Sequence, residues 1–74
     1  MTTQTLISGP AVHVAPELRE DCDRCGVTAK LTVALAQGGN LAFCGHHANR
    51  YAEHIRTIGT SITLELGFVW RGAP

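Results

Sequence analysis

The chain has 74 residues, of which 45% are apolar, and six Lys plus Arg balance six Asp plus Glu. A chain this short holds one small domain that buries only about 60% of its unfolded surface, so it needs a metal, a disulfide or a partner as further support. The zero net charge gives no general electrostatic reason for nucleic-acid binding, because phosphate contacts need a surplus of cations.

The cysteine count and the apolar runs restrict the compartment. Three cysteines cannot all pair within one chain, and no secretory signal pattern follows Met1. The longest apolar runs, Val33 to Ala36 and Leu41 to Cys44, have four residues each, whereas a membrane span needs roughly 20. We therefore expect a cytoplasmic protein without a membrane segment. In a reducing compartment, closely spaced cysteines more often bind metal or do redox chemistry than form disulfides.

Residues 1–21 contain Gly9, Pro10 and Pro16 and no sustained periodicity. This pattern predicts a flexible or extended N-terminal arm that adds no core. The end of the arm is acidic, since residues 1–23 carry one basic against four acidic side chains. His13 lies in this arm, and the sequence indicates no partner for it.

Residues 29–35 alternate between apolar and other side chains, a period of two that is typical of a half-buried strand. Gly38 and Gly39 follow in a turn sequence, and residues 41–43 form a second short apolar run. Together the runs predict a β-hairpin whose glycines supply the positive φ angles of a tight reversal.

From Gly45 the apolar period changes to steps of three and four, which predicts one helix running to about Thr57, with Gly59 as its stop. Arg50 and Arg56 would face water on this helix. The apolar positions on its buried side are Ala48, Tyr51, Ala52, Ile55 and Ile58.

After Gly59 the period returns to two, which predicts a C-terminal strand from Ile62 to Trp70 with Phe68 on its apolar face. Five large side chains in one row are more than a hairpin and a helix easily cover. Two interpretations stay open: the strand closes the domain's own sheet, or part of it is an edge available to a second chain.

The cysteines and histidines have the spacing of a metal site. Cys22 and Cys25 form a C-x2-C pair followed by Gly26, and Cys44 and His47 form a C-x2-H pair at the end of the hairpin. Two residues between ligands allow a tight knuckle, and a helix start after Cys44 places N–H groups near its thiolate. The four ligands predict one structural Zn²⁺ without an open position, whose binding energy of roughly 10 to 16 kcal/mol supports folding.

The same cysteines and histidines also allow other interpretations. His46 competes with His47 for the fourth position, but a spacing of three suits a helix start better than a spacing of two. His54 would lie about 10 Å further along the helix, which is too far for ligation. A C-x2-C redox pair, or Cys44 as a nucleophile with a histidine base, leaves the other cysteines unexplained. We therefore expect no enzyme activity and no small-molecule substrate.

The segments CDRCG at 22–26 and FCGHHAN at 43–49, with the Gly38-Gly39 turn, resemble small actinobacterial and actinophage zinc-ribbon-like proteins of uncharacterised function. The resemblance covers about residues 21–58. It implies a zinc knuckle, hairpin and helix similar to a treble clef or zinc ribbon, and it implies no established activity.

The sequence thus predicts a small metal-bound α+β fold, with an arm at 1–21, a zinc-binding domain at 22–58, and a C-terminal strand and tail at 59–74. The function expected is a protein-interaction module, with a large assembly such as RNA polymerase as the partner by analogy with zinc ribbons. Its candidate partner-binding residues are Phe68, Trp70, Arg50 and Arg56, and strand addition through residues 62–70 is the expected mode. The alternative is a DNA- or RNA-binding protein, with cations at Arg24, Lys30, Arg50, Arg56 and Arg71.

Overall fold

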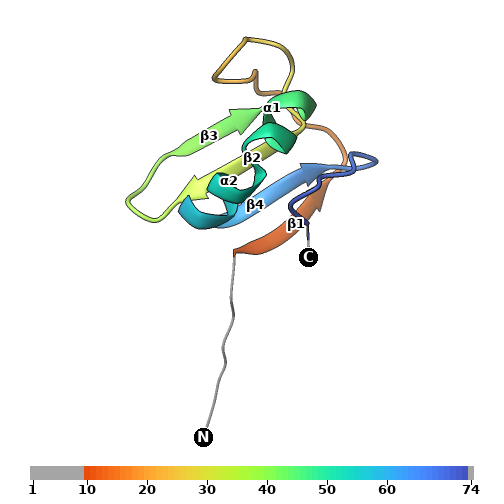
Figure 1. The fold of residues 1–74 in the computed structure, drawn as a ribbon. Coiled ribbons are helices and arrows are strands. Elements are labelled where there is room, and N and C mark those ends of the chain that lie inside the picture. The colour runs from red at the N-terminus through yellow and green to blue at the C-terminus, as the bar shows by residue number, and fades with distance from the viewer. Residues whose placement is uncertain (1–9, 74) are drawn as a thin grey trace, which may run out of the picture.

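The computed structural model describes residues 10–73 and contains a four-stranded sheet with two short helices across one face (Figure 1). The sheet order is β1-β4-β2-β3; β1 runs parallel to β4, and the other neighbours are antiparallel. This arrangement confirms a small α+β fold. The elements are β1 (Ala11–Ala15), β2 (Leu31–Leu35), β3 (Asn40–Phe43), α1 (Gly45–Arg50), α2 (Ala52–Ile58) and β4 (Gly59–Glu65).

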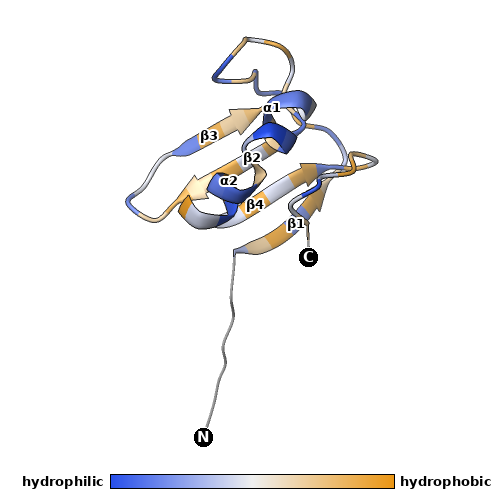
Figure 2. Cartoon of the chain, in the orientation of Figure 1, coloured by the Kyte–Doolittle hydropathy of each residue, from blue (hydrophilic) through white to orange (hydrophobic). Residues whose placement is uncertain are grey.

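The core lies between the helices and the two central strands. Leu31 pairs with Leu64 and Val33 pairs with Ile62 across β2 and β4, and all four side chains are buried. Ile55 of α2 packs on them with no exposed surface. Figure 2 shows many apolar residues along the strands and many hydrophilic residues along the helices that cross them. Each fully buried side chain of this kind stabilises the fold by about 1.5 to 3 kcal/mol.

The predicted hairpin is present. β2 and β3 pair from Leu31 opposite Phe43 to Ala34 opposite Asn40. Gly38 and Gly39 adopt φ angles of 104° and 84° in the connecting turn, as the sequence predicts.

The N-terminal segment differs from the expectation of an arm without core. Residues 11–15 form β1 in register with Ser61 to Glu65, and Leu18 is buried, with its N–H donating to Glu65 Oε1. Five residues between two prolines are too short for a periodic signal, and their partner strand lies 50 residues later in the chain. The expectation is therefore wrong for residues 11–15 and Leu18. For residues 1–9 the expectation of an arm lies outside the described residues.

The predicted single helix is interrupted at Tyr51. In a continuous helix the carbonyls of Ala48 and Asn49 would accept bonds from residues four positions later. Here the C-terminal segment occupies both carbonyls: Trp70 Nε1 donates to Ala48 O at 2.8 Å, and Arg71 Nη1 donates to Asn49 O at 3.0 Å. The interruption is a tertiary effect that helix periodicity cannot reveal. Within residues 10–73, no helix is long and apolar enough to cross a membrane.

The C-terminal strand is shorter than predicted. β4 ends at Glu65 and a turn at Gly67, with φ 90°, sends the chain back toward α1, where Trp70 is 3% exposed. β4 is paired on both sides, with β1 and with β2. It therefore closes the domain's own sheet, and the alternative of an edge at residues 62–70 is wrong, as is strand addition there.

Candidate metal centre

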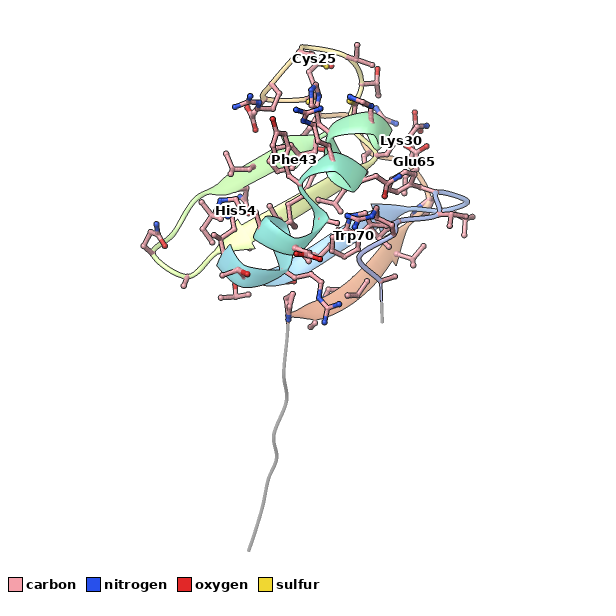
Figure 3. The ribbon with its side chains drawn as sticks, in the orientation of Figure 1. Cys25, Lys30, Phe43, His54, Glu65 and Trp70 are labelled. Carbon is pink, nitrogen blue, oxygen red and sulfur yellow. The ribbon has the colours of Figure 1, made fainter. Side chains whose placement is uncertain are left out.

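The four predicted ligands come from two segments, a loop and the start of a helix, that meet at one end of the sheet. Cys22 and Cys25 lie in the knuckle that precedes β2, and Figure 3 shows Cys25 in this loop beyond α1. Cys44 follows β3 directly and is the N-cap of α1, and His47 lies in the first turn of that helix. The hairpin thus brings together two ligand pairs that are separated in the sequence.

The knuckle is closed by short backbone bonds. Gly26 N–H donates to Cys22 O at 2.8 Å, and Cys22 N–H donates to Val27 O at 2.6 Å. Gly26 has φ 81°, a conformation that side chains with a Cβ rarely adopt, as its position after the C-x2-C pair indicated. The geometry explains why a glycine stands at this position.

Asp23 attaches the knuckle to the sheet, a role that the sequence analysis did not identify. Its N–H donates to Ala42 O at 2.9 Å, and its Oδ2 accepts from Ala42 N–H at 2.7 Å. These bonds continue the ladder beyond β3. The second ligand pair is therefore held at a defined position relative to the first.

Three separations between ligand atoms are close to those of a tetrahedral zinc site. Bond lengths of about 2.3 Å to sulfur and 2.0 to 2.1 Å to nitrogen place two sulfurs about 3.8 Å apart and a sulfur and a nitrogen about 3.6 Å apart. In the structure Cys25 Sγ lies 3.8 Å from Cys44 Sγ. His47 Nδ1 lies 3.6 Å from Cys22 Sγ and 3.4 Å from Cys44 Sγ. All four ligand atoms lie within 4.8 Å of one another, so they can hold one metal ion.

The electrostatics of the thiols fit a cation. Burial by itself raises the pKa of Cys22. Hydrogen bonds from the backbone N–H groups of Cys44, Arg24 and Cys25 and from His47 together lower it by more, so that the pKa is about 6. At Cys25 the Val27 N–H lowers the pKa, whereas desolvation and the neighbouring sulfurs of Cys22 and Cys44 raise it above its usual value. The sulfurs therefore oppose each other's ionisation, and a bound Zn²⁺ relieves this repulsion. The donor set is consistent with one structural zinc.

The helix start contributes to the same site. His47 N–H donates to Cys44 Sγ at 3.5 Å, which is the predicted contact between the first turn and the thiolate. His46 is exposed, with its ring centroid 5.0 Å from that of His47. The structure thus brings His47 into the cluster and leaves His46 at the surface.

The candidate partner-binding residues do not form one surface. Trp70 is part of the core and donates to Ala48 O, so its burial removes it from the candidate set. Phe68 is half-buried and packs against the core beside Gly45. Arg56 is exposed on α2, and Arg50 lies at the ring of Tyr51.

Next to the metal centre, Tyr51 organises a cluster that the sequence analysis missed. Its ring stacks on that of His47 at a centroid distance of 6.0 Å and an interplanar angle of 11°. The guanidinium of Arg24 lies 5.2 Å from the ring centroid and donates to the Tyr51 hydroxyl at 3.2 Å, and that of Arg50 lies at 5.8 Å. Helix periodicity marks Tyr51 as a core position and carries no signal for this role.

A groove of about 470 Å³ opens beside this cluster. We call it the Tyr51 groove. Its apolar lining comes from β3, α2 and the tyrosine ring, and its polar residues lie in the knuckle and on α2. The lining residues are Leu41, Phe43, Tyr51, Ile58, Asp23, Arg24 and His54.

Comparisons with known proteins identify a family whose function is unknown. A family model described as a domain of unknown function (DUF7455) matches residues 16–69. The matched region is longer than the resemblance at residues 21–58, since it includes β4 and the turn after it. No curated protein and no solved structure matches the chain.

Proposed function

Because the chain belongs to this family of domains of unknown function (DUF7455), we propose its function from its own structure: a zinc-stabilised, non-enzymatic module that binds a partner protein through the Tyr51 groove. The groove is the observation that carries the proposal. It combines an apolar floor with charged residues at its border, which is the composition of a protein-binding site.

The floor of the groove fits an apolar side chain of a partner. Leu41, Tyr51 and Ile58 are each half-buried, so they keep apolar surface that an inserted side chain can cover. Phe43 lies beneath them, buried and tilted against Tyr51 at a centroid distance of 6.4 Å. An aromatic or branched aliphatic side chain can thus gain contact without rearrangement of the core.

The border of the groove favours an acidic residue next to that side chain. Arg24 and Arg50 both lie at the Tyr51 ring, and His54 lies on the α2 side, labelled in Figure 3. Asp23 is the one carboxylate in the lining, and one of its oxygens already accepts from Ala42 N–H. A partner segment with an apolar anchor and a neighbouring carboxylate therefore complements this surface.

The same geometry supports a non-enzymatic role. Three thiolates and one imidazole would hold a zinc ion with four protein ligands, a set that would leave no position for water or substrate. A nucleophilic mechanism would need Cys44 and His47, and both belong to this cluster. A metal bound by His47 would also help to hold the Tyr51 ring at the groove, because the His47 ring stacks on it.

The partner class that we propose is a large assembly, with the transcription machinery and RNA polymerase preferred. This preference rests on analogy with zinc ribbons, which are frequent in that machinery. Any candidate subunit must expose a segment with an apolar side chain and a neighbouring carboxylate, because the groove complements that combination.

The experiment is affinity recovery of the zinc-loaded protein from native lysate after nuclease treatment, with mass spectrometry of the proteins that co-elute. Tyr51→Ala should lose a stoichiometric partner that the wild type retains, while zinc content stays at one per chain. Val27→Ala is the matched control, since Val27 is 60% exposed on the knuckle outside the groove. Equal recovery with Tyr51→Ala and wild type would reject the groove as the binding site.

A second candidate, nucleic-acid binding, is favoured by one observation: the guanidinium groups of Arg24 and Arg50 both lie near the half-buried Tyr51 ring, and cations beside an aromatic ring are typical of single-strand binding sites. Two other cations of the predicted set are already engaged, since Lys30 pairs with Glu65 at 2.7 Å and Arg71 bonds to Asn49. Binding of single-stranded DNA or RNA that weakens steeply with salt and is lost in Arg50→Gln would support this candidate.

A further inference from the structure

The two edges of the sheet differ in what covers them. Asp23 bonds to both backbone groups of Ala42 and so covers part of the outer side of β3. β1 is the opposite edge strand, and within residues 10–73 no element pairs with its outer side. An uncovered edge is a template for a further strand.

The register identifies the free groups on this edge. Leu66 N–H donates to Ala15 O, so the backbone groups of Ala15 point toward β4. In a parallel ladder alternate residues face the partner, and Ala11 and His13 therefore face β4 as well. The N–H and C=O groups of Val12 and Val14 point outward. Four backbone groups are thus available to a new strand.

The sequence of β1 is symmetric about its centre: Ala11-Val12-His13-Val14-Ala15 reads the same in both directions. From this symmetry and the outward groups of Val12 and Val14, we propose that β1 binds the β1 of a second copy of this chain, antiparallel and centred on His13. Val12 then lies opposite Val14 of the partner, and the two exchange both of their backbone hydrogen bonds. The twofold axis repeats the exchange and satisfies all four groups.

The side chains fit this pairing. Val14 is 62% exposed and gains a cross-strand contact with Val12 of the partner on the helix-covered side of the sheet. His13 lies opposite its own copy on the other side, and both alanines are small. β1 carries no Lys, Arg, Asp or Glu, so no such charges repel across the axis. Pro10 and Pro16 border the strand and limit the pairing to five residues.

The interface is short, so association is expected at high protein concentration. Stable interfaces bury roughly 1,200 to 2,000 Å², more than a five-residue strand pair supplies by itself. The Tyr51 groove lies toward the opposite edge of the sheet, at β3. The dimer therefore leaves both grooves open and presents two of them to one assembly.

The first experiment is analytical ultracentrifugation of the zinc-loaded full chain over a concentration series. Val14→Pro removes an N–H that points away from β4, so the fold keeps its own ladder bonds while the pairing loses two hydrogen bonds across the axis. We expect the dimer dissociation constant to rise at least tenfold. Val14→Lys should act similarly, and Val27→Lys, a matched change at an exposed valine of the knuckle, should leave it unchanged. A wild type that stays monomeric at millimolar concentration overturns the proposal.

A second experiment tests the register. Residue 13 faces its own copy as a non-hydrogen-bonded pair with about 4.5 Å between the Cα atoms, which a disulfide can span. His13→Cys should therefore form a covalent dimer with oxidised glutathione, which is reduced as the two thiols are oxidised. Ala11→Cys, opposite Ala15 of the partner, should stay monomeric, and the wild type controls for reaction of the zinc ligands. Crosslinking of Ala11→Cys equal to that of His13→Cys would overturn the centred register.

Discussion

The knuckle and the sheet are ordered by different forces. Along residues 22–28 most side chains are exposed, Val27 by 60%, whereas Leu31, Ile55 and Ile62 in the layer of strands and helices have no exposed surface. Apolar burial therefore stabilises the sheet and contributes little to the knuckle, which depends on hydrogen bonds and on the metal. A domain of this size combines the two because neither region alone provides enough stabilisation.

The two regions are coupled through shared residues. Cys22 and Cys44 are buried in the same cluster as Leu31 and Phe43, so two metal ligands are also core side chains. Loss of the metal leaves three thiol groups and an imidazole to be solvated next to that core. Disturbance of the metal centre is thus expected to spread into the sheet, and the following changes test how far.

Removal of zinc should have the largest effect. With a chelator at neutral pH we expect loss of the cooperative fold, because the metal supplies roughly 10 to 16 kcal/mol in comparable sites. Circular dichroism should report the loss of sheet and helix, and the emission of Trp70, the single tryptophan, should shift to the red. An apoprotein that keeps a buried Trp70 and a full sheet signal would mean that the core folds without the metal.

Trp70→Ala should break the core while sparing the ligands. The substitution removes a side chain that is 3% exposed and leaves Ala48 O without its donor, so we expect a loss of about 3 to 5 kcal/mol in unfolding free energy. Denaturant unfolding followed by circular dichroism measures it, and zinc content should remain one per chain. Val69→Ala is the control: Val69 is 85% exposed and should change stability by less than about 0.5 kcal/mol.

Gly59→Ala should have a smaller effect at the junction of α2 and β4. A Cβ at this position would clash with Val33 Cγ2 and lie 3.0 Å from Ile55 O, so we expect overpacking to cost about 1 to 3 kcal/mol. Thermal unfolding checks this value. The double variant with Val33→Ala should cost less than the sum of the single changes, and strict additivity would reject the clash as the cause.

Loss of the Lys30–Glu65 ion pair should have the smallest effect on the free energy of unfolding, and this effect should depend on pH. The hydrogen bond from Lys30 Nζ and that from the Leu18 N–H lower the pKa of Glu65 below its ordinary value of 4.5, and Figure 3 shows the two labelled side chains adjacent. A lowered folded-state pKa means that the stabilisation is present above the ordinary value and is lost as the pH falls through the folded value.

Wild type and Glu65→Gln should therefore differ most at neutral pH, and their difference should shrink below about pH 4.5. The comparison of the two proteins cancels the acid loss of zinc, which they share. A difference that stays constant down to pH 3 would contradict a lowered pKa at Glu65.

The sequence alone determined the ligand set and the hairpin. Cys22, Cys25, Cys44 and His47 could be identified because each pair forms within one turn, where spacing sets geometry. The hairpin followed from alternation around Gly38 and Gly39. These are local properties, in which the residues that interact are close together in the chain.

The tertiary structure alone decided β1, the interruption at Tyr51, the reversal that buries Trp70 and the Tyr51 groove. β1 exists because β4 offers it a partner 50 residues later, and the helix is interrupted because Trp70 and Arg71 take its carbonyls. In each case a donor or an apolar surface from a distant segment competes with the local preference. The spacing of residues along the chain cannot predict the result of this competition, because the result depends on which distant groups come within bonding distance after folding.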